Sequence, residues 1–189
     1  MFNIFNGFWL YDNSENEFKV RDLGYNVGYV ICEKYYNKAL NKKQAIKEMI
    51  ELNYNDENEL SNFVDKSDYF TNSLAYLKIE YNKNRPVVTG VKQFQNESQK
   101  VAPGLIELTI EFSELMDQNY RNFELGPLGQ PNLLRLKKFI GFSEDGKPAS
   151  FEIELKPNQR YQLLVGEGFR NSKGILLKPY LVDFKTDDN

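Results

Sequence analysis

Histidine, the side chain that enzymes use most often for acid–base catalysis, is absent from this 189-residue chain. The single cysteine, Cys32, therefore has no imidazole to deprotonate it, and a serine triad would lack the same partner. The 27 acidic residues make chance carboxylate pairs certain, but no spacing singles out one pair. The sequence thus predicts no catalytic residue, and we expect that this chain is not an enzyme by itself.

Two groups of oxygen-bearing side chains resemble parts of a calcium site. Asn53, Asn55 and Glu57 alternate as calcium ligands do, but the glycine and the bidentate glutamate that complete such a loop are missing. Three aspartates near the C-terminus form the second group: Asp183, Asp187 and Asp188. A solvated tail is the simpler interpretation of these aspartates. We therefore predict no metal site and no cofactor.

Charge and hydropathy narrow the range of partners. The formal net charge is −3 and the pI is near 5.2, whereas a surface that follows nucleic-acid phosphates needs clustered Lys and Arg. The one basic cluster, Arg135, Lys137 and Lys138, fits a solvated strand face. No apolar run in the sequence reaches membrane-spanning length. We expect a protein or peptide partner, no nucleic acid and no membrane span.

Three tyrosines are the candidate binding residues of the first half. A helix predicted from Asp22, as its N-cap, to about Ala39 would carry Tyr25, Tyr29 and Tyr36 along one stripe. These phenol rings could line a groove for a substrate or a partner. Core packing is the alternative, because aromatic residues at helical spacing are more often buried.

Small residues in the same predicted helix favour close packing against another helix. Gly24 and Gly28 are four residues apart and Cys32 continues their line, so the three share one helix face. Glycine inside a helix costs about 1 kcal/mol relative to alanine. We therefore expect a neighbouring helix to approach this face and offset that cost.

The rest of the first half also has helical periodicity. Apolar residues recur at helical spacing over 43–52 and 59–66, and Ser67 or Asp68 could cap a fourth element that contains Tyr69 and Ile79. The sequence predicts a small all-α helical domain over residues 1–82.

From residue 83 onward the hydrophobic period changes from helical to alternating. Within 105–112, Leu105, Glu107, Thr109 and Glu111 fall on one face and the apolar residues between them fall on the other. Further strands are predicted over 86–94, 149–155, 161–165 and 180–185. About seven short strands separated by turns indicate an antiparallel β-sandwich over residues 83–189. The predicted fold class is therefore α+β, with the helical domain first.

The first half carries an ordered set of motifs: Trp9-Leu10-Tyr11, Arg21–Tyr29, Tyr35-Tyr36 and Gln44-Ala45-Ile46. In this order they resemble the C-terminal end of a family of predicted zinc peptidases, which place a Gly-Tyr-x-x-Gly-Tyr helix after an HExxH active site. The resemblance implies that the zinc ligands and the catalytic glutamate precede this region, and none of them maps onto this chain. The aromatic start of the chain is not a signal peptide and looks cut from a larger protein. We therefore expect that a zinc site either lies upstream of this chain or has been lost.

The second half carries another ordered set, made of Phe112-Ser113-Glu114-Leu115-Met116, Leu155–Leu163, Gly174–Leu177 and Phe184-Lys185-Thr186. This set resembles the bacterial Ig-like modules of surface-layer and other cell-envelope proteins. The resemblance implies a cell-envelope or secreted location. Tyr161 has the place of a tyrosine corner, whose hydroxyl would bond to a loop carbonyl. The long excursion 117–135 departs from the pattern and is where a specific contact is expected.

These observations lead to one functional hypothesis and two alternatives. We expect a noncatalytic binding or accessory module of a bacterial envelope-associated protein, derived from the C-terminal part of a zinc peptidase-like protein. The first alternative is the non-ligand half of a metallopeptidase whose zinc site lies in a missing segment or another chain. The second is a structural spacer.

Overall fold

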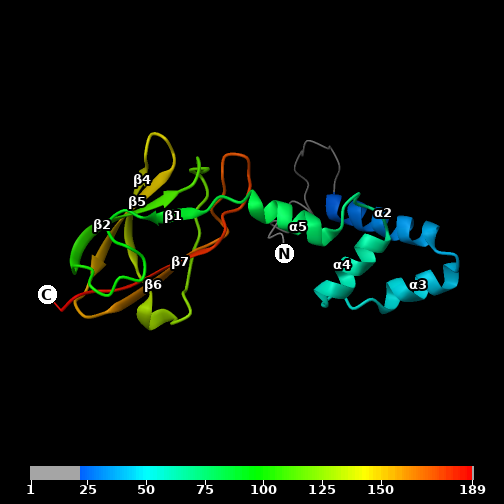
Figure 1. Ribbon diagram of the computed structural model, residues 1–189, viewed down its shortest axis with the longest axis horizontal. Coiled ribbons are helices and arrows are strands. Elements are labelled where there is room, and N and C mark those ends of the chain that lie inside the picture. The colour runs from blue at the N-terminus through cyan, green and yellow to red at the C-terminus, as the bar shows by residue number, and fades with distance from the viewer. Residues whose placement is uncertain (1–21, 189) are drawn as a thin grey trace. The chain divides into compact units, whose positions relative to one another are not determined.

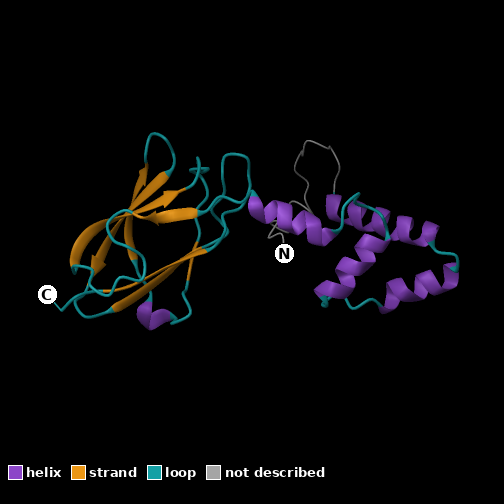
Figure 2. Cartoon of the chain, viewed as in Figure 1, coloured by secondary structure: helices purple, strands orange, loops and turns teal. Residues whose placement is uncertain are grey.

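The computed structural model describes residues 22–188, and the chain divides into two compact units between Tyr81 and Asn82. The first unit is helical and the second is built of strands and loops (Figure 2). This confirms the predicted fold class of a helical domain followed by an antiparallel β-sandwich. The motif Trp9-Leu10-Tyr11 and the start of the chain lie outside the described residues.

The helical unit has four described helices, which Figure 1 shows in blue to green. They are α2 (Leu23–Lys38), α3 (Lys42–Glu51), α4 (Glu57–Lys66) and α5 (Leu74–Lys83). The fourth predicted element therefore starts at Leu74, not after Ser67 or Asp68, because Asp65 Oδ1 accepts from the Leu74 amide at 2.8 Å. No helix in the described part of the chain is long and apolar enough to cross a membrane.

Side-chain caps fix the beginnings of α3 and α4. Asn41 Oδ1 accepts from the Gln44 amide at 3.1 Å, and Asp56 Oδ1 accepts from the amides of Asn58 and Glu59 at 2.8 and 3.1 Å. Each bond satisfies an amide that would otherwise lack a partner in the first helical turn. The polar turn that resembled part of a calcium loop is thus a helix start.

α2 begins at the predicted N-cap, Asp22, but without a capping hydrogen bond to its side chain. Asp22 occupies the N-cap position with a left-handed backbone (φ 56°), and its carbonyl accepts from the Tyr25 and Asn26 amides. The expected close packing at Gly28 is wrong within residues 22–188, because a Cβ built there meets nothing within 4 Å. Gly28 therefore lies on an open part of the helix surface.

The buried core of the described helices is small. Ala45, Phe63 and Val64 are its buried apolar residues within 22–81, and the Phe63 ring lies 4.6 Å from the Tyr35 ring, centroid to centroid. Through these residues α2 contacts both α3 and α4 (Figure 1). The sides of α2, α3 and α4 that face one another therefore hold the unit together.

The β unit consists of two antiparallel sheets. One has the strand order β1-β2-β5-β4 and the other the order β3-β6-β7. The strands are β1 (Val88–Val91), β2 (Gly104–Phe112), β3 (Phe123–Glu124), β4 (Leu136–Phe142), β5 (Pro148–Leu155), β6 (Arg160–Val165) and β7 (Tyr180–Lys185), with a short 3-10 helix, η1 (Gln130–Asn132), before β4. The predicted excursion 117–135 thus contributes β3 and η1.

The alternation predicted for β2 matches the observed burial except at Thr109, which lies on the polar face and is nevertheless buried. Leu108, Ile110 and Phe112 are buried in the core between the sheets, while Leu105 and Glu107 are exposed. β5 repeats the pattern and pairs with β2 over eight consecutive residue pairs. The core contains aromatic side chains from both sheets and from the loop between β6 and β7, among them Phe151, Phe184 and Phe169.

Tyr161 forms the expected tyrosine corner, but its hydroxyl has a different hydrogen-bond partner from the one predicted. Its hydroxyl accepts from the Lys156 backbone amide at 2.8 Å, so it satisfies an amide and not the loop carbonyl that the sequence suggested. Its ring is buried beside Phe184, with centroids 5.6 Å apart. The turn after β5 is thereby tied to the core.

Asp183 does not belong to a solvated tail or to a calcium site. It lies in β7, is buried, and its carboxylate accepts hydrogen bonds from Arg160 and Gln162. A carboxylate whose charge is neutralised by a guanidinium and whose oxygens already accept hydrogen bonds is a poor ligand for a cation. Among the described residues, no group of three or more acidic or cysteine side chains is placed to hold a metal ion.

The outer edges of the two sheets are short, irregular or covered. β1 has four residues and β3 has two. β4 changes register twice, between Leu136 and Lys138 and between Phe139 and Gly141. Along the outer edge of β7, the Glu97 amide donates to the Asp183 carbonyl at 2.6 Å and the Lys185 amide donates to the Ser98 carbonyl at 2.8 Å.

The first register shift in β4 lies within the basic cluster and brings Lys137 and Lys138 beside glutamates of β5. Lys137 Nζ lies 2.6 Å from Glu154 Oε2, and Lys138 is paired in register with Glu152. Both glutamates are on the outer face of β5. The lysines are thus balanced by carboxylates on the exposed face of the sheet, which agrees with the solvated strand face that we expected.

A candidate binding pocket in the helical unit

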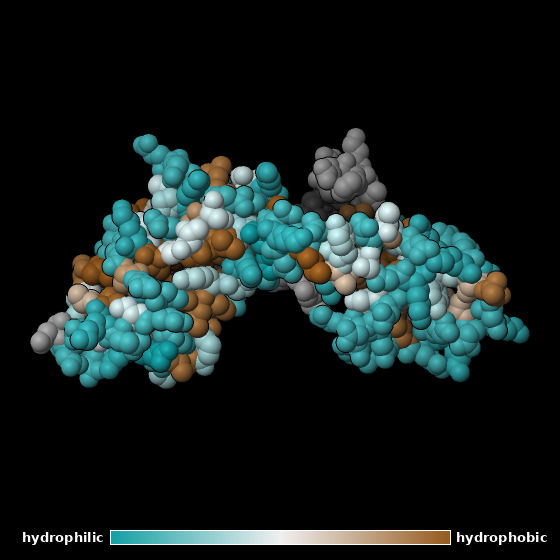
Figure 3. Space-filling view, viewed as in Figure 1, coloured by the Kyte–Doolittle hydropathy of each residue, from teal (hydrophilic) through white to brown (hydrophobic). Residues whose placement is uncertain are grey.

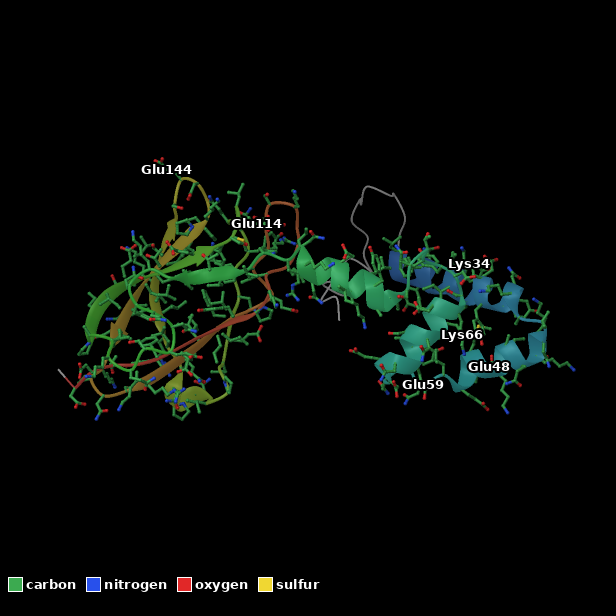
Figure 4. The ribbon with its side chains drawn as sticks, viewed as in Figure 1. Lys34, Glu48, Glu59, Lys66, Glu114 and Glu144 are labelled. Atoms are coloured by element: carbon green, nitrogen blue, oxygen red, sulfur yellow. The ribbon has the colours of Figure 1, made fainter. Side chains whose placement is uncertain are left out.

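A hollow of the helical unit lies where α2, α3 and α4 meet and has a volume of about 380 Å³. Figure 4 shows three of its charged residues, Glu48 on α3 and Glu59 and Lys66 on α4. It is lined by Tyr35, Glu48, Glu51, Leu52, Glu59, Asn62, Phe63 and Lys66. We call this hollow the helical pocket.

The wall of the helical pocket is apolar. Phe63 on α4 is buried, and the ring of Tyr35 on α2 packs against it with an angle of 48° between the two ring planes. Leu52, just after α3, is half-buried. Packing two rings together fixes their orientation and leaves one side of the pair facing the pocket. The three residues provide a surface on which the carbon chain of a ligand can pack.

Carboxylates surround this wall. Glu48 accepts hydrogen bonds from the Tyr35 hydroxyl and from Gln44 Nε2, the latter at 3.0 Å. The Tyr35 hydrogen bond lowers the pKa of the Glu48 carboxyl, and Gln44 and the charge of Lys66 act in the same direction. Glu48 is therefore ionised at neutral pH and held in one position.

The Tyr35 hydroxyl is fixed in the complementary state. The hydrogen bond to Glu48 raises the pKa of the phenol most, and burial and the Glu48 charge raise it further. Tyr35 therefore stays protonated and donates to Glu48 across neutral pH. The pair links α2 to α3 at the edge of the helical pocket.

The charges of the helical pocket do not cancel. Three lining glutamates, Glu48, Glu51 and Glu59, face a single lining ammonium, that of Lys66. Lys47, outside the lining, lies 3.8 Å from Glu51 in an exposed pair, which leaves Glu48 and Glu59 against Lys66. Glu59 also accepts from the Asn53 amide at 3.3 Å, which orients it toward α3. An apolar wall beside surplus carboxylates suits a ligand with an aliphatic stem and a cationic end, such as a Lys or Arg side chain.

The three tyrosines predicted from the sequence lie on another face of α2. Tyr25 and Tyr29 are 54% and 67% exposed, and Tyr29 donates to Glu33 at 3.4 Å. Tyr36 is half-buried, with Lys42 Nζ lying 4.8 Å from the centre of its ring. A groove formed by these three rings stays a prediction. The structure brings Tyr35, their neighbour, into the helical pocket.

Sequence reasoning missed Tyr35 because it followed a single stripe. Tyr36 continues the line of Tyr25 and Tyr29, whereas Tyr35 lies about 100° around the helix. The sequence signal that could have indicated Tyr35 was Phe63, a large apolar residue of the third predicted helix that must pack against another large side chain. Cys32, also on α2, is a half-buried free thiol.

A second hollow, of about 300 Å³, lies on the outer face of the larger sheet of the β unit. Thr109 and Ser150 lie at its base with their hydroxyl oxygens 3.0 Å apart, and Gln93 Nε2 donates to Thr109 Oγ1 at 3.0 Å. These polar groups largely satisfy one another. The helical pocket, with its surplus carboxylates, is the better candidate site.

The chain was compared with known proteins by sequence and by structure. No family model and no curated protein sequence matches it. Among solved structures, CopC from Methylosinus trichosporium OB3b is similar, with a TM-score of 0.41 and 14% identity over 55% of this chain and 94% of CopC. The S-layer protein rSbsC(31-844) is similar with a TM-score of 0.38 and 15% identity, over 87% of this chain and 23% of that protein. Neither comparison supports the resemblance to zinc peptidases.

Proposed function

We propose that this chain is a noncatalytic binding module that holds a basic segment of a protein or peptide in its helical pocket. The observation that carries the proposal is the helical pocket itself, in which three glutamates and one lysine surround a wall made by Tyr35, Leu52 and Phe63. The bound residue would be a lysine or arginine whose stem packs on the wall and whose charge meets the carboxylates.

The dimensions and chemistry support this proposal. A volume of about 380 Å³ falls within the range of roughly 300–1,000 Å³ that is usual for ligand pockets. The Glu48 carboxylate is already oriented by Tyr35 and Gln44, so little ordering entropy is lost when a cation binds. The β unit would serve as the accessory part of the module.

A location in the cell envelope or outside the cell is part of the proposal. It is based on the ordered Ig-like motifs within residues 85–187. The two other roles, the non-ligand half of a metallopeptidase and a structural spacer, stay predictions. Metal analysis of the purified chain together with a peptidase assay tests the first of them, and the binding experiment below separates the module from the spacer.

The test is binding of fluorescent peptides measured by anisotropy. Extended peptides with Lys or Arg at the centre are compared with peptides that carry Gln or Glu there, at low and high salt. We expect binding of the basic peptides alone, weakened by salt because exposed charges are screened. The Glu48→Gln, Glu59→Gln double variant should weaken binding by about tenfold, or about 1.4 kcal/mol.

The matched control is Glu144→Gln. Glu144 is an exposed glutamate in the turn between β4 and β5 of the β unit (Figure 4), so its substitution removes a negative charge that does not line the helical pocket. Equal losses in the control and the double variant, or no preference for basic peptides, would contradict the proposal.

A further inference from the structure

The turn between α2 and α3 carries an apolar side chain among lysines. Leu40 is fully exposed, with a relative exposure of 105%, and its neighbours in sequence include Lys38, Lys42 and Lys43. Figure 3 shows hydrophobic surface at this end of the helical unit, on a surface that is otherwise mostly hydrophilic. We call residues 38–43 the α2–α3 tip.

Hydrogen bonds hold the α2–α3 tip in one conformation. The Ala39 amide donates to the Tyr35 and Tyr36 carbonyls, both at 3.2 Å. Lys42 Nζ donates to the Tyr36 and Asn37 carbonyls at 2.7 and 2.9 Å, and Lys38 pairs with Asp68. Leu40 and the exposed Lys43 are therefore presented on an ordered turn, so docking it costs little further conformational entropy.

The α2–α3 tip complements the helical pocket of the same chain type in charge and in polarity. The tip offers one aliphatic side chain, that of Leu40, beside the ammonium group of the exposed Lys43. The helical pocket offers the wall of Tyr35, Leu52 and Phe63 beside an excess of carboxylates. These features are what the proposed function requires of a ligand, and they occur in this chain itself.

We propose that the α2–α3 tip of one copy docks into the helical pocket of a second copy, and this inference rests on the proposed function. Leu40 packs against Tyr35 and Phe63 of the second copy, and Lys43 meets its Glu51 and Glu59. A chain cannot insert its own tip, because the tip joins α2 and α3, which also form two walls of its own pocket.

The position of the two features along α3 favours a closed dimer. From Asn41 to Glu48 the helix rises about 10 Å, at 1.5 Å per residue, so tip and pocket are close neighbours on one unit. Two copies related by a twofold axis can then exchange tips, which satisfies both pockets and leaves no open end. The dimer is weak, because one turn per copy buries far less than the roughly 1,600 Å² of a standard interface.

The experiment is sedimentation equilibrium of the full chain over a concentration series up to millimolar, at low and high salt. We expect a monomer–dimer equilibrium that high salt shifts toward monomer. Lys43→Glu alone, and Glu51→Lys with Glu59→Lys, should each raise the dimer dissociation constant by at least about tenfold, since each places like charges in contact. Glu144→Lys is the control and should leave the constant unchanged, and circular dichroism establishes that all variants are folded.

Mixing the two charge-reversed chains gives the decisive measurement. The Lys43→Glu chain places a glutamate at the proposed contact position of the tip and keeps the acidic pocket, and the Glu51→Lys, Glu59→Lys chain keeps Lys43 in the tip and has a basic pocket. Each should be monomeric alone, and an equimolar mixture should form a heterodimer. A mixture of folded variants that stays monomeric overturns the inference.

Two other outcomes also overturn it. A wild-type dimer that withstands both charge reversals places the interface elsewhere. A wild-type chain that is monomeric at millimolar concentration, yet binds basic peptides in its helical pocket, leaves the proposed function intact and assigns the pocket to a different protein.

Discussion

The guanidinium of Arg160 and the carboxylate of Asp183 form a two-point ion pair between adjacent strands, β6 and β7. Arg160 Nε lies 2.9 Å from Asp183 Oδ1, and its terminal nitrogen lies 2.7 Å from Oδ2. Oδ2 also accepts from Gln162 Nε2 at 2.8 Å. Such paired hydrogen bonds fix both the distance and the orientation of the two groups.

Replacing Asp183 with Asn should lower the free energy of unfolding by roughly 1–3 kcal/mol. The variant removes one hydrogen-bond acceptor shared by Arg160 and Gln162, and it leaves Arg160 without its counter-charge. The Arg160 side chain is half exposed, which keeps the loss at the lower end of that range. Urea denaturation of the full chain measures the change. Asp188→Asn, in the exposed tail, is the control and should stay within about 0.5 kcal/mol.

The same pair predicts a dependence of stability on pH. The hydrogen bonds from Arg160 lower the pKa of the Asp183 carboxyl most, against the opposing effect of burial, with Gln162 and the Arg160 charge assisting. A carboxyl whose pKa is lower in the folded state stabilises the fold above its unfolded pKa of about 3.9. That contribution is lost as pH falls through the folded pKa. Between pH 5 and pH 2 the wild type should therefore lose more stability than Asp183→Asn, and equal losses would show that the pair carries no such linkage.

Tyr161→Phe should destabilise the β unit by roughly 1–3 kcal/mol. The ring stays in the core, but the Lys156 amide loses the hydroxyl that accepts its hydrogen bond. Thermal and urea unfolding of the variant measure the cost. Tyr76→Phe, which removes an exposed hydroxyl from α5, provides the comparison, and an effect no larger than in this control would mean that solvent replaces the Tyr161 hydroxyl.

Two glycines should respond to alanine in opposite directions. Gly28→Ala should stabilise α2 by up to about 1 kcal/mol, since alanine favours the helix and its methyl group enters open space. Gly126→Ala should destabilise the β unit, because a Cβ there would lie 2.6 Å from Gln162 Oε1, which also accepts from the Leu128 amide. Urea unfolding of both variants tests this, and a destabilised Gly28→Ala would reveal a contact at that face.

The elements of the fold were largely predictable because their signals are local. The alternation of Leu108, Ile110 and Phe112 with polar residues requires one buried face, and these three residues are buried in the structure. The helix starts at α3 and α4 likewise follow from the capping residues Asn41 and Asp56. In each case the signal lies within a few residues of the feature that it predicts.

What the sequence could not provide depends on contacts between distant segments. The helical pocket needs Tyr35 and Phe63, 28 positions apart in the chain, to pack ring against ring, and nothing in the stripe of Tyr25 and Tyr29 indicates this. The register shifts of β4 are set by its pairing with β5. The aspartates near the C-terminus were interpreted as a solvated tail, and only the fold reveals that Asp183 is buried and paired with Arg160.

The short, irregular or covered sheet edges affect how neighbouring copies of this protein can associate. A strand that offers an even row of free amides and carbonyls invites a neighbouring chain to extend the sheet, which is how cross-β aggregates begin. Here two register shifts interrupt β4 and residues 96–101 cover β7. Neighbouring copies are therefore disfavoured from joining their sheets edge to edge, even at high protein concentration.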